Sequence, residues 1–210
     1  PQVSYTKGQE WQRVRMTPQS WLVDAIWLDY RLAVALTVVM PLLLLIWAFA
    51  VGLRPLIQLL IVYWRVSSLL AVTVYLMIGG LPVSFLSGAM ARLLILVCLW
   101  FWRDWSAALE QSRTWAARAF LLWRWGLTGY MGAGILFSGA FVPCAFRTSL
   151  PEECRAWFGP PLGFREIFHP NVSPELLGSV GAWGLVAYLL YSLYFVWRLR
   201  PGTDKGELEA

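Results

Sequence analysis

The fold class is decided by stretches such as LIQLLIVYWRVSSLLAVTVYLMIGG, residues 56–80, in which every residue except one is uncharged. A helix crosses the hydrocarbon core of a bilayer with about 20 apolar residues, and this stretch is longer than that. It therefore predicts a transmembrane helix. The exception is Arg65, which stands near the middle of the stretch and raises the question of what stabilises a cation there.

The composition also indicates a membrane protein. Of 210 residues, 59% are hydrophobic and 14% are charged, and the mean hydropathy is +0.58, which is more apolar than a soluble domain of this size. The 14 tryptophans suit the headgroup level of a bilayer, and the net charge of +5 suits anionic lipids. The arginines are scattered through apolar segments and form no basic patch, which excludes nucleic acid as a partner.

Five apolar runs are predicted to cross the membrane, and a segment before them is predicted to be helical. From Thr17 to Tyr30, apolar residues alternate with Asp24 and Asp29, which predicts an amphipathic helix that lies at the interface or runs into the first span. The expected fold class is an all-α membrane protein, a bundle of five transmembrane helices with an amphipathic N-terminal helix. The predicted spans lie near 32–53, 55–78, 83–102, 119–142 and 176–197.

These spans divide the chain into an N-terminal extension, the amphipathic helix, one membrane domain and a polar tail. An odd number of spans places the two ends of this region on opposite sides of the membrane. Lysine and arginine are divided equally between the two sides, so the positive-inside rule does not set the orientation. The boundaries are 1–16 for the extension, 17–30 for the amphipathic helix, 31–199 for the membrane domain with its long loop 143–173, and 200–210 for the tail.

Two cations, Arg65 and Arg92, are predicted near the middle of the bilayer, where a charge is costly. No acidic residue lies inside a span, and Asp29 is the nearest candidate if its helix runs inward. Three interpretations stay open: the side chains reach water, carbonyls or lipid phosphates; a partner chain supplies the counter-charge; or the residues line a substrate or ion path. The residues predicted to contact a partner or lipid are Arg65, Arg92, Arg124, Gln58 and Ser68.

Small residues recur at helical spacing in three of the spans, which favours close packing of helices within the bundle or with a neighbour. A flat pigment such as chlorophyll or a carotenoid would also fit against such a surface, although nothing in the sequence requires one. The predicted packing residues are Ser84, Gly88, Gly129, Ala133, Gly134, Ser138, Gly178, Gly181 and Gly184.

The long loop contains two cysteines and the chain's single histidine. Cys144 and Cys154 have nine residues between them and would form a disulfide in an oxidising compartment, or stay free thiols in the cytoplasm. His169 is a weak candidate ligand for the magnesium of a pigment, and a solvated loop histidine is the simpler interpretation. No catalytic motif and no set of metal ligands is present, so we expect no enzyme, no metal site and no required cofactor.

The segments MTPQSWL, VYWRVSSLLAVTVYLMI, PVSFLSGAMARLLILVCLWFW and PPLGFREIFH resemble an uncharacterised family of cyanobacterial multi-pass membrane proteins, which is defined only as a domain of unknown function. The resemblance covers roughly residues 16–199 and depends on whole segments, not on a catalytic motif. It implies the thylakoid or plasma membrane of a cyanobacterium.

The expected function is that of a non-catalytic accessory subunit or assembly factor of a photosynthetic membrane complex, with photosystem II favoured over photosystem I. Photosystem subunits and lipids are then the expected partners. One alternative is a small anion transporter or channel with a path lined by Gln58, Arg65, Ser68 and Arg92. Another is a pigment-binding membrane protein.

Overall fold

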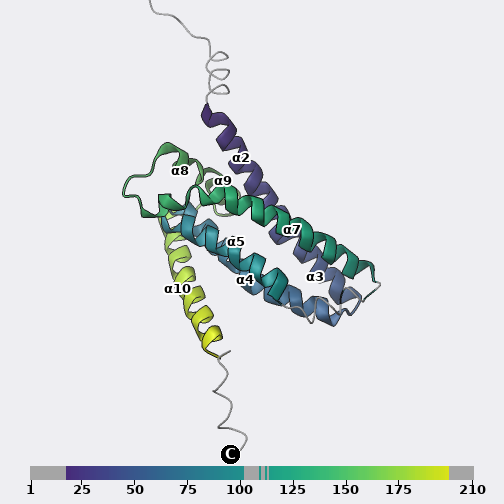
Figure 1. Ribbon diagram of the computed structural model, residues 1–210. Coiled ribbons are helices and arrows are strands. Elements are labelled where there is room, and N and C mark those ends of the chain that lie inside the picture. The colour runs from purple at the N-terminus through teal and green to yellow at the C-terminus, as the bar shows by residue number, and fades with distance from the viewer. Residues whose placement is uncertain (1–17, 102–108, 110–111, 113, 199–210) are drawn as a thin grey trace, which may run out of the picture.

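The computed structural model describes residues 18–101, 109, 112 and 114–198, and this part of the chain folds into helices and turns without a strand (Figure 1). The predicted extension 1–16 and tail 200–210 lie outside the described residues. From Arg54 onward the helices are α4 (Arg54–Ile78), α5 (Val83–Phe101), α7 (Trp115–Gly139), the 3-10 helix η2 (Val142–Phe146), α8 (Glu152–Ala156), α9 (Gly159–Phe168) and α10 (Pro174–Arg198).

The chain begins with one helical rod made of α2 (Pro18–Ala33), the π-helical segment η1 (Val34–Val39) and α3 (Met40–Ala50). The N-terminal segment, expected to lie at the interface or to run into the first span, continues without a break into η1 and α3. No glycine or proline interrupts the chain around Arg31, so nothing there stops the helix. The 31 residues of Ser20–Ala50 would measure about 46 Å, more than the bilayer core of about 30 Å, so the rod tilts or extends beyond the core.

The π-helical segment follows from Pro41, which has no N–H to donate to the preceding turn. The carbonyl of Thr37, its partner in an α-helix, instead accepts a hydrogen bond of 2.9 Å from the hydroxyl of Tyr63. The carbonyl of Leu36 accepts one of 2.8 Å from the indole N–H of Trp123. Side chains from α4 and α7 thus satisfy the carbonyls that the proline leaves unpaired, and they fix the rod to both helices.

Among the described residues, four helices are long and apolar enough to cross a membrane: Ser20–Ala50, Arg54–Ile78, Val83–Phe101 and Pro174–Phe195. They correspond to four of the five predicted spans. The segment predicted as the fourth span is helical in α7, but α7 is not among these four. The start of α2 and the end of α10 lie at opposite ends of the molecule (Figure 1).

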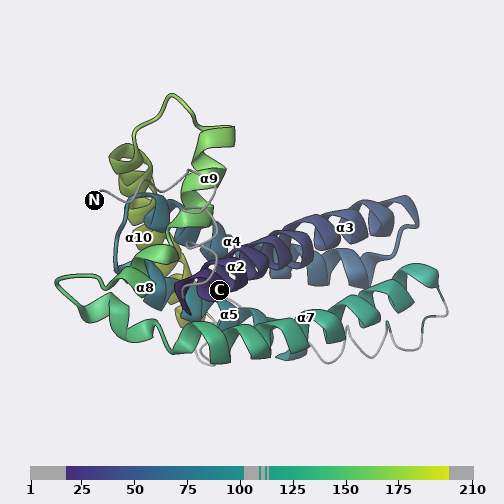
Figure 2. The same cartoon turned by 90° about the horizontal axis from the view of Figure 1, so that it is seen from above.

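The hairpin of α4 and α5 stands at the centre, joined by a tight turn in which Gly80 has a φ of +65°, a conformation that glycine adopts without strain. The rod and α7 pack on this hairpin, and α10 packs on α4 (Figures 1 and 2). The main core lies between α3, α4, α5 and α7. Its most deeply buried side chains include Leu56, Leu60, Ile95, Leu127 and Met131.

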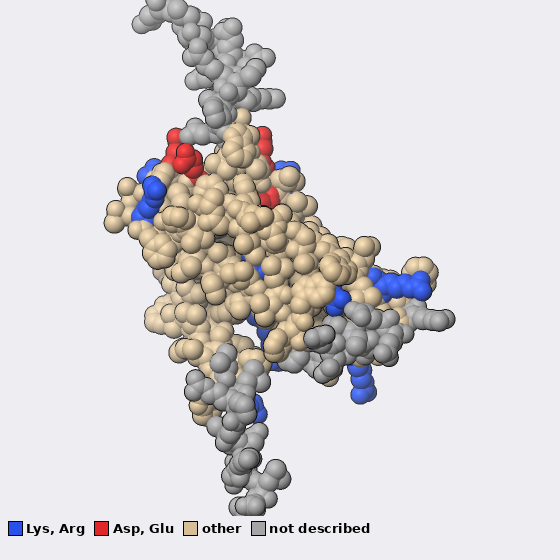
Figure 3. Space-filling model, in the orientation of Figure 1, with Lys and Arg blue, Asp and Glu red and all other residues tan. Residues whose placement is uncertain are grey.

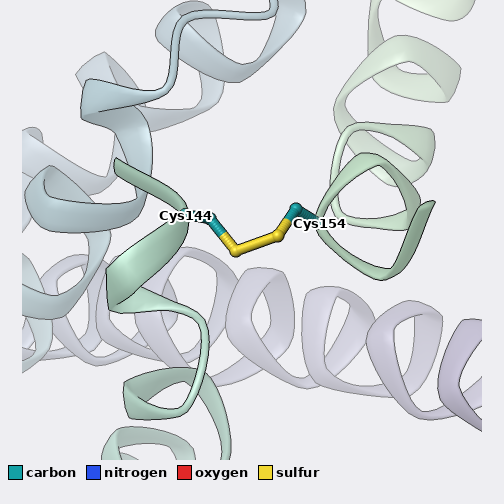
Figure 4. The surroundings of a disulfide bond; sticks show 2 residues. All are labelled: Cys144 and Cys154. Carbon is teal, nitrogen blue, oxygen red and sulfur yellow. A yellow bond between two sulfur atoms is a disulfide. The ribbon is translucent and has the colours of Figure 1, made fainter. Parts of the chain in front are cut away.

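The predicted long loop is largely helical and forms a cap at the end of the molecule where α2 begins. Helix α9 is the longest helix of this cap. Cys144 and Cys154 are joined by a disulfide with a Cα–Cα distance of 6.2 Å (Figure 4). Together with Trp157 they pack against Leu22 and Ile26 of α2, so the cap holds the start of the rod.

Helix α10 approaches α4 through glycines. A Cβ at Gly178 would lie 2.7 Å from the Cα of Gly79, and a Cβ at Gly181 would lie 2.7 Å from the backbone nitrogen of Leu76. At Gly184 the nearest atom would be a side-chain carbon of Val72, at 3.3 Å. The prediction that these glycines pack helices together is therefore confirmed for α10, and the packing is within the chain.

A pair of matched substitutions tests this packing. Gly181→Ala places a methyl group against the backbone of α4 and should lower the melting temperature of the protein in mild detergent. Gly126→Ala in α7 meets nothing within 4 Å and should leave the melting temperature unchanged or raise it, because alanine favours a helix over glycine by about 1 kcal/mol. Equal effects of the two substitutions would contradict the close approach of α10 and α4.

Candidate functional site

The buried cation Arg92 is neutralised within the chain. Its Nη2 lies 2.5 Å from Oδ2 of Asp29, and the two side chains are 9% and 12% exposed. Arg92 comes from the middle of α5 and Asp29 from α2. Because α2 runs inward as part of the rod, Asp29 reaches the level that we predicted to lack an acidic residue.

Tyr130 and Gly134 of α7 complete this site. The hydroxyl of Tyr130 lies 2.9 Å from Oδ1 of Asp29 and 2.8 Å from its backbone carbonyl, so the donated proton is shared between them. The guanidinium of Arg92 lies 5.7 Å from the Tyr130 ring centre. A Cβ at Gly134 would overlap the guanidinium, so glycine is what allows Arg92 to fit. We call Asp29, Arg92, Tyr130 and Gly134 the buried polar cluster.

The buried polar cluster corrects one expectation. The hypothesis that a partner chain supplies the counter-charge of Arg92 is wrong, because Asp29 supplies it. Gly134, predicted as a packing residue, packs within the bundle, where it makes room for Arg92 of α5. The hydroxyl of Ser138 donates to the Gly134 carbonyl at 2.7 Å. The cluster ties α2, α5 and α7 together at a buried level.

Arg65 has different surroundings from Arg92. It is exposed on α4, and its Nη1 lies 3.4 Å from the hydroxyl of Tyr191 on α10. It lines a pocket of about 720 Å³ together with Tyr191, Tyr194, Phe195 and Arg198. We call this pocket the α4–α10 wedge.

Gln58 and Ser68 are also exposed on α4, and the Ser68 hydroxyl donates to the carbonyl of Arg65 at 2.7 Å. Arg92, by contrast, is enclosed by α2, α5 and α7. The structure thus separates the residues of the predicted anion path into an exposed group and a buried one.

Arg124 is 3% exposed, and its guanidinium lies 4.5 Å from the centre of a Trp100 ring, a cation–π contact between α7 and α5. The neighbouring Thr128 supports this contact, because its hydroxyl accepts a hydrogen bond of 3.1 Å from the Trp100 indole N–H. This buried cation therefore contacts its own chain, and it is not placed to meet a partner or lipid.

His169 ends α9 and connects the cap to α4. Its Nε2 lies 3.1 Å from the hydroxyl of Tyr75, and its ring packs near that of Phe164 at 6.1 Å between centres. This contact occupies one of the two ring nitrogens that could ligate a metal ion. A role as pigment ligand stays a prediction.

The predicted small-residue positions divide into inward and outward groups. Ser84 is fully buried, and a Cβ at Gly88 would contact Thr73 of α4 at 3.4 Å. Gly129 and Ala133 of α7 face outward and are exposed, and a Cβ at Gly129 would meet nothing within 4 Å. The inward group is explained by packing in the chain, whereas the described residues make no such contact with Gly129.

A family described as "Protein of unknown function (DUF3177)" matches residues 23–203. The chain belongs to the DUF3177 family. The match includes the rod from Val23 onward and all the other described helices, so it confirms the resemblance to an uncharacterised family. Neither the curated proteins nor the solved structures gave a match.

Several residues of these sites in the DUF3177 chain were missed in the sequence. Tyr130, Tyr191 and Tyr194 were not singled out, because a tyrosine in a span is ordinary composition. Arg198 was not singled out, because it follows the last predicted span. The spacing of the last three at positions 191, 194 and 198 places them on one helical face, and this signal could have grouped them. Across the described residues, no three His, Cys, Asp or Glu side chains come together as metal ligands.

Charge removal tests the buried polar cluster. Arg92→Leu leaves Asp29 buried without its counter-charge, and the free energy of unfolding should fall by about 3–5 kcal/mol. Asp29→Leu should have a similar effect. The double substitution removes both charges and should recover part of the loss, which thermal melts of the four proteins in mild detergent would show. Additive losses in the double variant would contradict the ion pair.

Proposed function

We propose that this DUF3177 protein is a non-catalytic accessory subunit or assembly factor of a larger membrane complex, docked laterally through α7. We further propose a cyanobacterial thylakoid or plasma membrane as its location, and photosystem II before photosystem I as the complex. The resemblance to cyanobacterial membrane proteins supports the location. The unexplained outward face of α7 is the observation that carries the docking role.

The proposal includes five crossings, with α7 as the one that hydropathy alone does not identify. Helix α7 is 25 residues long, as are α4 and α10. It packs along α5 and contacts α3 (Figures 1 and 2). Its buried Arg124 lowers the mean hydropathy but is covered by Trp100. A fifth crossing also accounts for the opposite positions of the start of α2 and the end of α10, with the start of α2 placed at the interface.

The outward face of α7 offers a smooth surface for another helix. Gly126, Gly129 and Ala133 are exposed, and a Cβ at either glycine would meet no atom of the described residues within 4 Å. Leu122 and Leu136 flank them and are 78% and 83% exposed. We call these five residues the α7 face. In lipid, helices associate where small residues let the backbones approach closely, because apolar burial gives little driving force there.

The glycines of the α7 face are costly unless something contacts them. Each glycine in a helix interior costs about 1 kcal/mol relative to alanine. Gly134, Gly178 and Gly181 recover this cost through contacts that a methyl group would block. Gly126 and Gly129 have no such contact within the described residues. A helix of a partner subunit against the α7 face would supply it.

Tagged full-length protein, purified from its native membranes in mild detergent, should comigrate with subunits of one larger complex on a native gel. Gly126→Leu and Gly129→Leu together should remove this comigration, because the leucines hold the partner helix away. Leucine also favours a helix over glycine, so loss of folding is not expected. Mass spectrometry of the bands identifies the partner.

The matched control is Ala187→Leu, which adds the same side chain at an exposed position of α10 and should leave comigration unchanged. A wild-type protein that migrates alone would contradict the accessory role. Pigment absorption in that isolated protein would favour the pigment-binding alternative, and anion flux in liposomes would favour the transporter. Comigration that survives the leucines would contradict the α7 face as the docking site.

We also place the capped end of the molecule on the oxidising side of the membrane, because disulfides persist in such compartments. Acidic side chains gather at this end (Figure 3). In membranes prepared without reductant and then denatured, alkylation should modify Cys98 alone, the free cysteine of the structure. Prior reduction should add Cys144 and Cys154. Labelling of all three without reduction would place the cap on the reducing side.

A further inference from the structure

Helices α4 and α10 touch at one end and separate at the other. Gly178 and Gly181 bring the two backbones into contact near the capped end. Further along, bulky residues face α4 instead: the Tyr188 hydroxyl reaches the Val66 carbonyl at 3.5 Å, and Tyr191 reaches Arg65. Figure 1 shows α10 diverging from the hairpin in this direction. Glycines at one end and tyrosines at the other therefore produce the α4–α10 wedge.

The wedge is strongly positive. Arg65 and Arg198 both line it, and the hydroxyls of Tyr191 and Tyr194 lie beside them. Among the residues that the structure describes, neither arginine has a carboxylate within 4.0 Å. Two guanidinium groups and two hydroxyls supply hydrogen-bond donors suited to an anion.

The wedge opens toward the end of α10 that is distant from the cap (Figure 1). Tyr191 lies four residues, about 6 Å, before Phe195, where the candidate span of α10 ends. Arg65 lies eleven residues, about 16 Å, from the start of α4 at Arg54. The long stem of Arg65 reaches Tyr191, so its guanidinium can meet a headgroup that enters between the two helices. Arg198 lies just beyond the end of the span. Phe195 provides an apolar wall of the same pocket, against which the start of an acyl chain fits.

We propose that the α4–α10 wedge is a binding site for one anionic phospholipid. Its phosphate lies between Arg65 and Arg198 and accepts hydrogen bonds from Tyr191 and Tyr194, while its acyl chains follow the opening between α4 and α10. The bound phosphate answers the question of what stabilises Arg65 inside an apolar helix. The site does not involve the α7 face and holds independently of the docking role.

The experiment is native mass spectrometry of the full-length protein in mild detergent, titrated with phosphatidylglycerol or with phosphatidylcholine. Wild-type protein should bind one phosphatidylglycerol in preference to phosphatidylcholine. Arg65→Gln and Arg198→Gln should each weaken phosphatidylglycerol binding about fivefold, which is about 1 kcal/mol for each cation near the membrane surface. The matched controls are Arg54→Gln, also on α4, and Arg118→Gln on α7, which remove exposed cations outside the wedge.

Each other outcome overturns the lipid site in a distinguishable way. Equal losses in the wedge variants and the controls would mean non-specific charge attraction. Displacement of phosphatidylglycerol by excess inorganic phosphate would mean a site for a small soluble anion. Wild-type protein that binds no lipid until Asp204, Glu207 and Glu209 are neutralised would mean that the chain's own tail fills the wedge. Melting temperatures of all variants establish that each is folded.

Discussion

The ion pair between Arg92 and Asp29 constrains the arrangement of three helices. A single guanidinium buried in an apolar region is costly, and the carboxylate that offsets this cost comes from Asp29 in the first helix of the rod. The rod must therefore run inward without a break, and α7 must present Gly134 where the guanidinium passes. The carboxylate and the tyrosine that holds it fix α2, α5 and α7 in one register.

Two further departures from ideal helix packing have simple chemical causes. Pro41 cannot donate a backbone hydrogen bond, and the carbonyls left free by it hold the side chains of Tyr63 and Trp123. The glycines of α10 bring it onto α4 at one end, and the tyrosines that follow hold it off at the other. In both places, the size of a few residues or a missing hydrogen-bond donor determines how whole helices pack.

Arg92 and Arg124 both contact residues of their own chain in the interior. The candidate binding sites therefore lie at the surface. The α7 face and the α4–α10 wedge differ in kind. One is smooth and uncharged and suits a helix, whereas the other is cationic and suits an anionic headgroup. A protein built in this way would hold a lipid beside one helix and a partner beside another, which is consistent with a subunit that stabilises a larger assembly.

The sequence by itself determined the class of protein and four of the helices that can span a membrane, because these follow from apolar length. It placed Cys144 and Cys154 close enough to pair and left the disulfide itself open. The sequence named Asp29 as the nearest candidate acid, but which residue meets which cation was decided by the tertiary structure. Asp29 and Arg92 are 63 positions apart and Arg65 and Tyr191 are 126 apart, so no local pattern connects them. In the folded protein a charge is buried where another helix brings a counter-charge, as Asp29 does for Arg92, or an aromatic ring, as Trp100 does for Arg124.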